Sequence, residues 1–157
     1  MTEMNKSEEQ DYRSAREAAV KYIGSNFSRS RAAIRHKLQR LGYESGLIEQ
    51  VIVDLEDMDY LSDLRAARIS VARHQGRRAK GDLFLKNLLY EQGIDRVAAE
   101  EVLSELPPEA SRLMELLADL SSSLKDKGYQ RAYRFLLGRG FSSDLVRRAL
   151  EETFEEE

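Results

Sequence analysis

Cysteine is absent from this chain of 157 residues. Its absence excludes a disulfide framework and any metal site built on thiolates, and it suits a reducing compartment. No apolar stretch approaches the roughly 18 residues that a membrane-spanning helix needs. The N-terminus is acidic, with Glu3, Glu8 and Glu9, and lacks the pattern of a secretory signal. We therefore expect a cytoplasmic protein with no membrane contact.

Proline and glycine are also scarce, with two and nine residues respectively. Runs of β-branched residues bounded by turns are absent, which argues against a sandwich or a barrel. Charged residues make up 34% of the chain and hydrophobic residues 41%, a balance typical of surface-exposed helices around a modest core. The sequence predicts an all-α protein.

One local pattern occurs three times along the chain. A helix-like stretch ends in a glycine and an apolar residue follows at once, in Leu41-Gly42-Tyr43, Gln92-Gly93-Ile94 and Arg139-Gly140-Phe141. The glycines lie 51 and 47 residues apart, the spacing of repeats that contain two or three helices. Glycine suits such a corner because the residue after a helix end commonly adopts a left-handed conformation. The pattern predicts three internal repeats.

Alignment on these glycines brings apolar residues into register on both sides of the corner. Leu38, Leu89 and Leu136 lie four residues before the glycine, and Ile34, Leu85 and Ala132 lie eight before it. Six residues after the glycine stand Ile48, Ala99 and Val146, followed by the pairs Val51/Ile52, Val102/Leu103 and Ala149/Leu150. These spacings predict two amphipathic helices joined by a short turn in each repeat.

The chain divides into an acidic, unstructured segment (1–11) and three three-helix repeats (12–61, 62–106 and 107–157, the last with an acidic tail). Pro107-Pro108 marks the boundary between the second and third repeats. At the boundary between the first and second repeats, Ser62 or Asp63 is expected to cap the helix that follows. The expected helices cover residues 12–26, 30–41, 45–58, 63–75, 79–91, 95–105, 109–125, 129–138 and 142–155. Each repeat alone leaves an apolar face open, so neighbours must stack. This predicts an elongated, curved array of the right-handed type, acting as a monomer.

Charge is distributed unevenly along a chain whose formal net charge is only −3. Two segments, 28–40 and 64–81, contain no acidic residue, and arginine outnumbers lysine in both. Their cations are Arg29, Arg31, Arg35, Lys37 and Arg40 in the first, and Arg65, Arg68, Arg73, Arg77, Arg78 and Lys80 in the second. Such runs are either ordinary solvated helix faces or a surface for a polyanion or an acidic protein. We take these eleven residues as the candidate binding surface.

No pattern in the chain predicts catalysis, a metal or a cofactor. His36 and His74 are isolated, without carboxylates or cysteines at the spacing of metal ligands. The Gly138-Arg139-Gly140 sequence lacks the third glycine and the preceding strand of a dinucleotide-binding loop. We expect a binding protein and not an enzyme.

The segment Ser30–Tyr43 resembles a serine-initiated helix of the RecX family of bacterial recombination regulators, with its lysine-leucine pair and its glycine-aromatic corner. Residues Ile48–Leu61 are similar to the helix that follows in that family, and Lys86–Ile94 repeats the pattern in the second repeat. The likeness extends over roughly residues 14–154 and implies three tandem three-helix units.

The resemblance also implies a partner and an activity. A RecX-like protein would bind the RecA recombinase filament on DNA, lodge in its helical groove, and block its growth or promote its disassembly. RecA ATP hydrolysis, strand exchange and the induced self-cleavage of the SOS repressor would all decrease. Single- and double-stranded DNA would be contacted weakly or through RecA.

Two other functions remain open on the residues alone. A helical-repeat adaptor for an acidic protein would bind no DNA and would not respond to RecA. A direct nucleic-acid binder would act without a recombinase, with an affinity that decreases steeply with salt. A mobility-shift assay with single-stranded DNA, with and without RecA, separates the three hypotheses.

Overall fold

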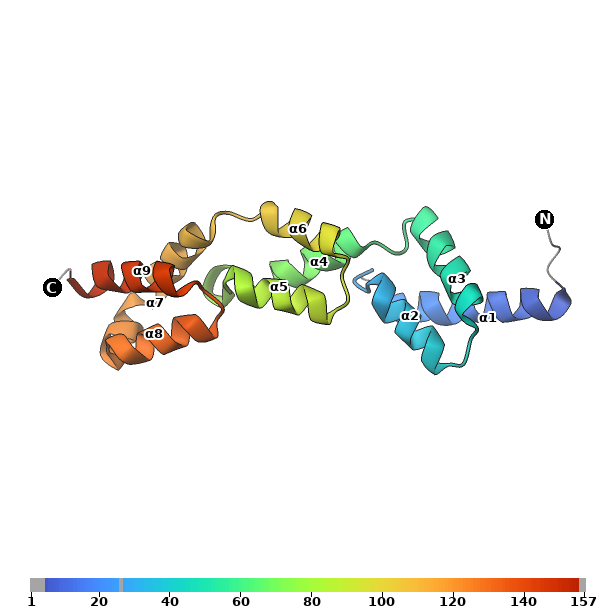
Figure 1. Cartoon of the computed structure of the whole chain (residues 1–157), viewed down its shortest axis with the longest axis horizontal. Helices are drawn as coiled ribbons and strands as arrows, with labels where there is room; N and C mark the ends of the chain where they lie inside the picture. The colour runs from blue at the N-terminus through green and yellow to red at the C-terminus, as the bar shows by residue number, and fades with distance from the viewer. Residues whose placement is uncertain (1–4, 26, 156–157) are drawn as a thin grey trace.

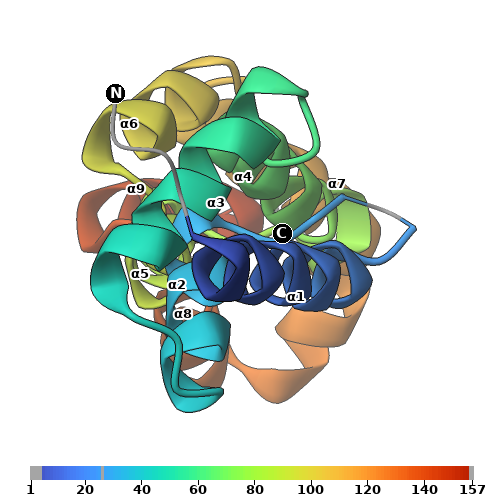
Figure 2. The ribbon, with the colours of Figure 1, turned by 90° about the vertical axis from the view of Figure 1, so that its right-hand side faces the viewer.

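The computed structural model describes residues 5–25 and 27–155, and within these ranges every regular element is helical. The chain forms an elongated body with its termini at opposite ends (Figure 1). Viewed from the end that carries α1, the helices lie behind one another within one rounded outline (Figure 2). The predicted all-α, elongated architecture is confirmed, whereas its handedness stays a prediction. No helix in the described ranges has the length and apolar character to cross a membrane.

Three clusters of buried apolar side chains lie along this body. The first draws on α1 (Lys6–Ile23), α2 (Arg31–Arg40) and α3 (Ser45–Asp57). The second draws on α4 (Asp63–Ala72), α5 (Asp82–Glu91) and α6 (Arg96–Ser104), and the third on α7 (Glu109–Lys127), α8 (Tyr129–Gly138) and α9 (Ser143–Glu155). We call these groups of helices the first, second and third units, and propose them as the three repeats.

The three glycine corners share one hydrogen-bond pattern. Gly42, Gly93 and Gly140 have φ angles of +89°, +69° and +87°. In the first unit the amide of Tyr43 donates to the carbonyl of Leu38 at 3.2 Å, and the amide of Gly42 donates to that of Gln39 at 3.0 Å. The same pair of bonds recurs at the other two corners. This is the Schellman ending of a helix, and it requires a left-handed residue where the glycine stands.

The apolar positions aligned on these glycines form the cores. Leu38, Leu89 and Leu136 are fully buried, as are Ile34, Leu85 and Ala132 at the position four residues earlier. Ile48, Ala99 and Val146, six residues after the glycine, are at most 1% exposed. The repeat register inferred from the sequence is therefore the register of the buried faces.

The N-terminal prediction is wrong for the described part of the segment 1–11. Helix α1 begins at Lys6, because the side chain of Asn5 accepts from the amide of Glu8 at 2.9 Å and the Glu8 carboxylate accepts from the amide of Asn5 at 3.0 Å. This reciprocal capping box stabilises the first turn despite its polar composition. Residues 1–4 lie outside the described ranges.

The basic linker of the second unit also departs from the prediction. Helix α4 ends at Ala72, a single 3-10 turn, η1 (Gly76–Arg78), follows, and α5 begins only at Asp82. The helix expected over 63–75 ends three residues early, because Arg73 is already its C-cap and the backbone is extended at Gln75; Gly81 is the N-cap of α5. The predicted cap by Ser62 is confirmed, because its side chain accepts from the amide of Arg65 at 3.2 Å.

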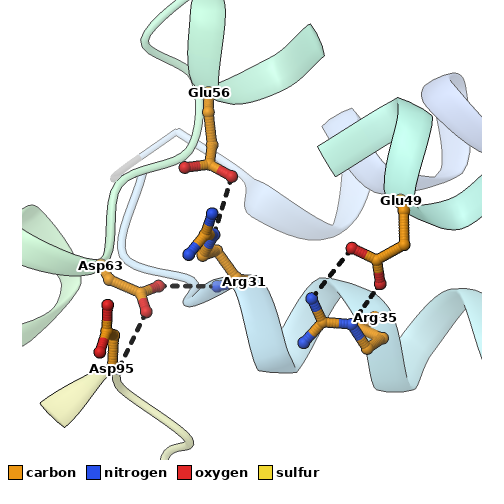
Figure 3. A network of polar contacts seen from close by, with 6 residues as sticks. All are labelled: Arg31, Arg35, Glu49, Glu56, Asp63 and Asp95. Atoms are coloured by element: carbon orange, nitrogen blue, oxygen red, sulfur yellow. Dashed lines mark hydrogen bonds and ion pairs between the residues drawn. The ribbon is translucent and has the colours of Figure 1, made fainter. Parts of the chain in front are cut away.

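At each of the two joints between units, an acidic residue at the start of the later unit accepts hydrogen bonds from two backbone amides. The carboxylate of Asp63 accepts from the backbone amides of Arg31 in the first unit, at 2.9 Å, and of Asp95 in its own unit, at 3.1 Å (Figure 3). At the second joint the carboxylate of Glu109 accepts from the amides of Asp82, at 3.3 Å, and Ser142, at 3.1 Å. The donors occupy the same positions relative to the corner glycines, so the two joints are built alike.

The corner glycine of each later unit also lies against the unit before it. A Cβ atom at Gly93 would lie 2.4 Å from the Cβ of Ala32 in α2, and one at Gly140 would lie 2.4 Å from the Cβ of Phe84 in α5. Next to these contacts, the hydroxyl of Ser30 donates to the carbonyl of Gln92 at 2.9 Å, and the amide of Gly81 donates to the carbonyl of Arg139 at 2.8 Å. The glycines thus allow a close approach of units as well as a tight turn.

Candidate functional site

Four of the eleven predicted site residues are paired with carboxylates. The pairs are Arg31 with Glu56, Arg35 with Glu49, Arg65 with Asp59, and Arg68 with Glu105. The guanidinium of Arg35 donates to both oxygens of Glu49, at 2.6 and 3.2 Å (Figure 3). This hydrogen bonding raises the pKa of Arg35 and lowers the pKa of Glu49. Their charges are largely neutralised, so these four arginines are poor candidates for binding an anion.

The other seven form no ion pair with any carboxylate in the described ranges. They are Arg29, Lys37, Arg40, Arg73, Arg77, Arg78 and Lys80. The structure thus divides each basic segment of the sequence into a neutralised part and a part whose charge is available. Which cations lie next to one another then depends on how the helices pack.

In the first unit, Arg29 and Lys37 share one aromatic ring. The guanidinium carbon of Arg29 lies 4.3 Å from the ring centre of Tyr22, and the ammonium of Lys37 lies 5.3 Å from it. The Nε of Arg29 also donates to the carbonyl of Tyr22 at 3.3 Å. Contact with the ring face holds both cations beside α1 without removing their charge.

In the second unit, cations crowd around the linker between α4 and α5. His74 packs edge-on against Phe84 with ring centres 5.3 Å apart, and the ammonium of Lys80 lies 4.8 Å from the centre of the same ring. Burial lowers the pKa of His74, and the charges of Lys80 and Arg73 lower it further. Burial and the charge of Arg139 likewise lower the pKa of Lys80. Mutual repulsion of this kind identifies a region of positive potential.

In the third unit, Arg139 and Lys127 lie over the ring of Phe135, at 4.8 and 5.3 Å from its centre. Arg139 also reaches back to the second unit, where its guanidinium donates to the carbonyls of Arg77 at 2.9 Å and Ala79 at 3.2 Å. These bonds bring a residue of the third corner beside the basic linker of the second unit.

A series of neighbouring cations therefore extends over all three units. Arg29 of the first unit and Arg73 of the second line the same cavity of about 180 Å³ between their units, and this connects the groups described above. We call the series the basic band; its members are the cations Lys37, Arg29, Arg73, Lys80, Arg139 and Lys127 and, between them, His74, whose lowered pKa leaves it mostly uncharged at neutral pH. A run of cations interleaved with aromatic rings suits the binding of an extended polyanion.

Sequence reasoning found four members of the band and missed three. His74 was considered only as a metal ligand or a catalytic base, and Arg139 and Lys127 lie outside the two acid-free segments. Arg77 and Arg78 lie on η1 beside the band, whereas Arg40 is an exposed residue at the end of α2. The sequence does place Lys127 and Arg139 on either side of Phe135. Only the fold, however, shows that Arg139 lies beside residues about 60 positions earlier in the chain.

The described residues contain no group of three or more histidine, cysteine, aspartate or glutamate side chains placed to hold a metal ion. A cavity of about 560 Å³ lies along the polar face of α1 and is lined by Lys6, Glu9 and Arg13 among others. It has no link to the basic band. The candidate site is therefore the basic band, which is spread along the molecule.

Comparisons with known proteins agree on one family. Residues 117–150 match the family model described as RecX, third three-helix domain. A regulatory protein RecX from Prosthecochloris aestuarii is 31% identical over 144 residues, covering 90% of this chain and 95% of that protein. A regulatory protein RecX from Neisseria meningitidis is 30% identical over 131 residues, covering 81% and 83%. The crystal structure of RecX from Lactobacillus salivarius has the same fold, with a TM-score of 0.82 at 24% identity over 92% of this chain and 97% of that one.

Proposed function

Because this chain belongs to the RecX family of regulatory proteins, we propose that it binds the filament that RecA forms on DNA and lowers the activity of that filament. ATP hydrolysis by RecA, strand exchange and the induced self-cleavage of the SOS repressor all decrease when it binds. The protein acts as a monomer in the cytoplasm and contacts DNA weakly or through RecA.

The basic band is the observation that carries this proposal. It extends over three units whose order along the body is that of the chain (Figure 1). A filament presents repeated surfaces and a bound strand along its axis, and a long body with cations along its length can contact several of them at once. Several weak contacts made by one body bind more tightly than any of them alone.

The joints support the proposal from a different direction. Asp63 and Glu109 each bind amides on both sides of a joint through a carboxylate, and such charge-assisted bonds are stronger than neutral ones. The units are therefore held at defined angles. A body of defined shape loses less entropy on binding than a flexible chain of units does.

The test is the ATPase rate of RecA on single-stranded DNA, titrated with this protein and with two matched variants. The first variant, Arg29→Gln, Arg73→Gln and Lys127→Gln, removes one exposed cation of the band from each unit. The second, Arg35→Gln, Arg68→Gln and Arg147→Gln, removes the same number of charges from arginines that pair with Glu49, Glu105 and Asp144.

We expect the natural chain to inhibit, the band variant to inhibit weakly, and the paired variant to resemble the natural chain. Inhibition should also weaken with salt, because exposed charges are screened. RecA ATPase rate and filament length that do not change at an excess of the natural chain would refute the proposal. Equal losses in the two variants would show that net charge, and not the band, is responsible.

A further inference from the structure

The cavity between the first and second units has a lining that distinguishes it from the rest of the basic band. It holds about 180 Å³, and its polar lining comes from Ser28, Arg29, Ser30, Ser70, Arg73 and Gln92. The remaining lining residues are Ala33, Ala66 and Ile69, so no carboxylate takes part. The cavity combines residues that precede or begin α2, residues of α4, and the residue before the corner glycine of the second unit.

Hydrogen bonds orient the polar groups of this cavity. The hydroxyl of Ser70 donates to the side-chain oxygen of Gln92 at 2.8 Å, which directs the amide nitrogen of Gln92 elsewhere. The hydroxyl of Ser30 donates to the backbone carbonyl of Gln92 at 2.9 Å and accepts from the amide of Ala33 at 3.1 Å. Gln92 is thus held from both units, and within the described part of the chain its two side-chain amide hydrogens donate to no acceptor.

The two arginines retain most of their donors. Arg29 uses its Nε to bond the carbonyl of Tyr22, and its terminal nitrogens bond no acceptor in the described ranges. Arg73 lies at the end of α4 and is exposed, and no hydrogen bond or ion pair within those ranges engages its guanidinium. A planar guanidinium presents its donors as a fork that matches the oxygens of a phosphate.

We infer that this cavity binds one phosphodiester group of a single DNA strand, held between the guanidinium groups of Arg29 and Arg73 and by the side-chain amide of Gln92. The inference deepens the proposed function and rests on it, because both arginines belong to the basic band. The DNA strand, and not only RecA, is then a direct partner of the chain, and the first joint is the place of contact.

Binding here has a consequence for the shape of the molecule. The phosphate is held by Arg29 of the first unit and by Arg73 and Gln92 of the second. It therefore forms a second link across the first joint, in addition to the link that the Asp63 carboxylate makes between the amides of Arg31 and Asp95. A ligand that binds only the assembled joint stabilises it by mass action. The strand therefore restricts opening of the first joint while it is bound.

The test uses the full chain without RecA and follows the side-chain amide signal of Gln92 by NMR. Inorganic phosphate and a short oligothymidylate are titrated separately into the natural chain and into two doubly substituted chains. Arg29→Gln with Arg73→Gln removes the cations of the cavity. Arg40→Gln with Arg78→Gln removes two exposed cations that do not line it.

We expect the oligothymidylate to shift the Gln92 amide signal in the natural chain and in the Arg40/Arg78 variant, and not in the Arg29/Arg73 variant. The dependence of log affinity on log salt should decrease in slope by about 0.7 in the Arg29/Arg73 variant, the value for one phosphate contact on a single strand. Amide exchange at Arg31 should slow on binding, because the joint opens less often.

Two results overturn the inference. The first is a Gln92 signal that does not respond to the oligothymidylate; if it responds to inorganic phosphate instead, the cavity is a small-anion site. The second is a response to the oligothymidylate that persists in the Arg29/Arg73 variant. Either of them, together with undiminished inhibition of RecA, leaves the proposed function standing. A Gln92 response without any effect on RecA refutes the proposed function and keeps the cavity.

Discussion

Alanine substitutions at Gly140 and Gly42 separate the two reasons for a corner glycine. The residues have almost the same φ angle, +87° and +89°, and end their helices with the same pair of hydrogen bonds. A left-handed conformation costs an L-residue about 1–2 kcal/mol, so both substitutions should destabilise the chain by that amount. Only Gly140 lies at a joint, where the new Cβ would meet Phe84 at 2.4 Å from its Cβ and 2.6 Å from its amide nitrogen, whereas Gly42 has nothing within 4 Å.

Relief of the contact at Gly140 requires α5 and the third corner to move apart, because part of the obstacle is backbone. Overpacking of this kind costs about 1–3 kcal/mol. The expected loss of unfolding free energy is therefore about 1–2 kcal/mol for Gly42→Ala and about 2–5 kcal/mol for Gly140→Ala. At about 2–4 °C per kcal/mol for a chain of this size, the two melting temperatures should differ by several degrees.

The measurement is urea and thermal unfolding followed by circular dichroism, with hydrogen exchange in the third unit as a local readout. Exchange is needed because units in a repeat array can unfold separately. Equal losses for the two variants would refute the reasoning, since they would mean that the joint tolerates a methyl group. The first joint offers a cycle: Ala32→Gly should recover part of the loss caused by Gly93→Ala, because the obstacle there is a side-chain atom.

Three further substitutions test the joints and the basic band. Asp63→Asn keeps the shape but removes the charge that binds two amides, so unfolding free energy should decrease by about 1–3 kcal/mol in urea titrations. The side chain of Arg112 is only 3% exposed and donates to the backbone carbonyls of Pro107 and Lys80. Arg112→Met removes both donors, so the unfolding free energy should decrease by about 2–4 kcal/mol in the same assay. A smaller decrease would show that water replaces the guanidinium. Burial and then the charges of Lys80 and Arg73 lower the pKa of His74 from 6.5. The unfolded chain therefore binds more protons than the folded chain. The contribution of His74 to the unfolding free energy is fully present above pH 6.5 and is lost as the pH falls below that value. His74→Gln should flatten that pH dependence of the unfolding free energy, and parallel curves for the two proteins would contradict it.

Helix ends were predicted well where a local signal marks them. The Schellman corners at Gly42, Gly93 and Gly140 depend on the glycine and on residues within one turn, and all three are visible in the sequence. The start of α1 was missed because Asn5 and Glu8 cap a polar first turn, which periodicity of apolar residues does not detect. The end of α4 was predicted three residues too far along the chain, because neither Arg73, its C-cap, nor Gln75, where the backbone is extended, is a residue that typically ends a helix.

The candidate surface was predicted less well, because charge pairing depends on helix packing. Arg68 and Glu105 are 37 residues apart in the chain but bond at 2.7 Å, and Arg31 and Glu56, 25 residues apart, bond at 2.8 Å. A run of arginines without nearby acids in the sequence therefore contains members that acids neutralise in space.

The sequence by itself determined the helical repeat, because the period of the apolar residues and the left-handed glycine act within one or two turns. Tertiary structure alone decided which cations lie side by side and which are neutralised. The angle between units brings Arg29 to Arg73 at one joint and Arg139 to Lys80 at the other. Those angles are set by Asp63, Glu109 and the close approach of glycine to the preceding unit, contacts between residues about 30 to 60 positions apart. Distances of that kind are a property of the packed molecule, since no local pattern of residues encodes them.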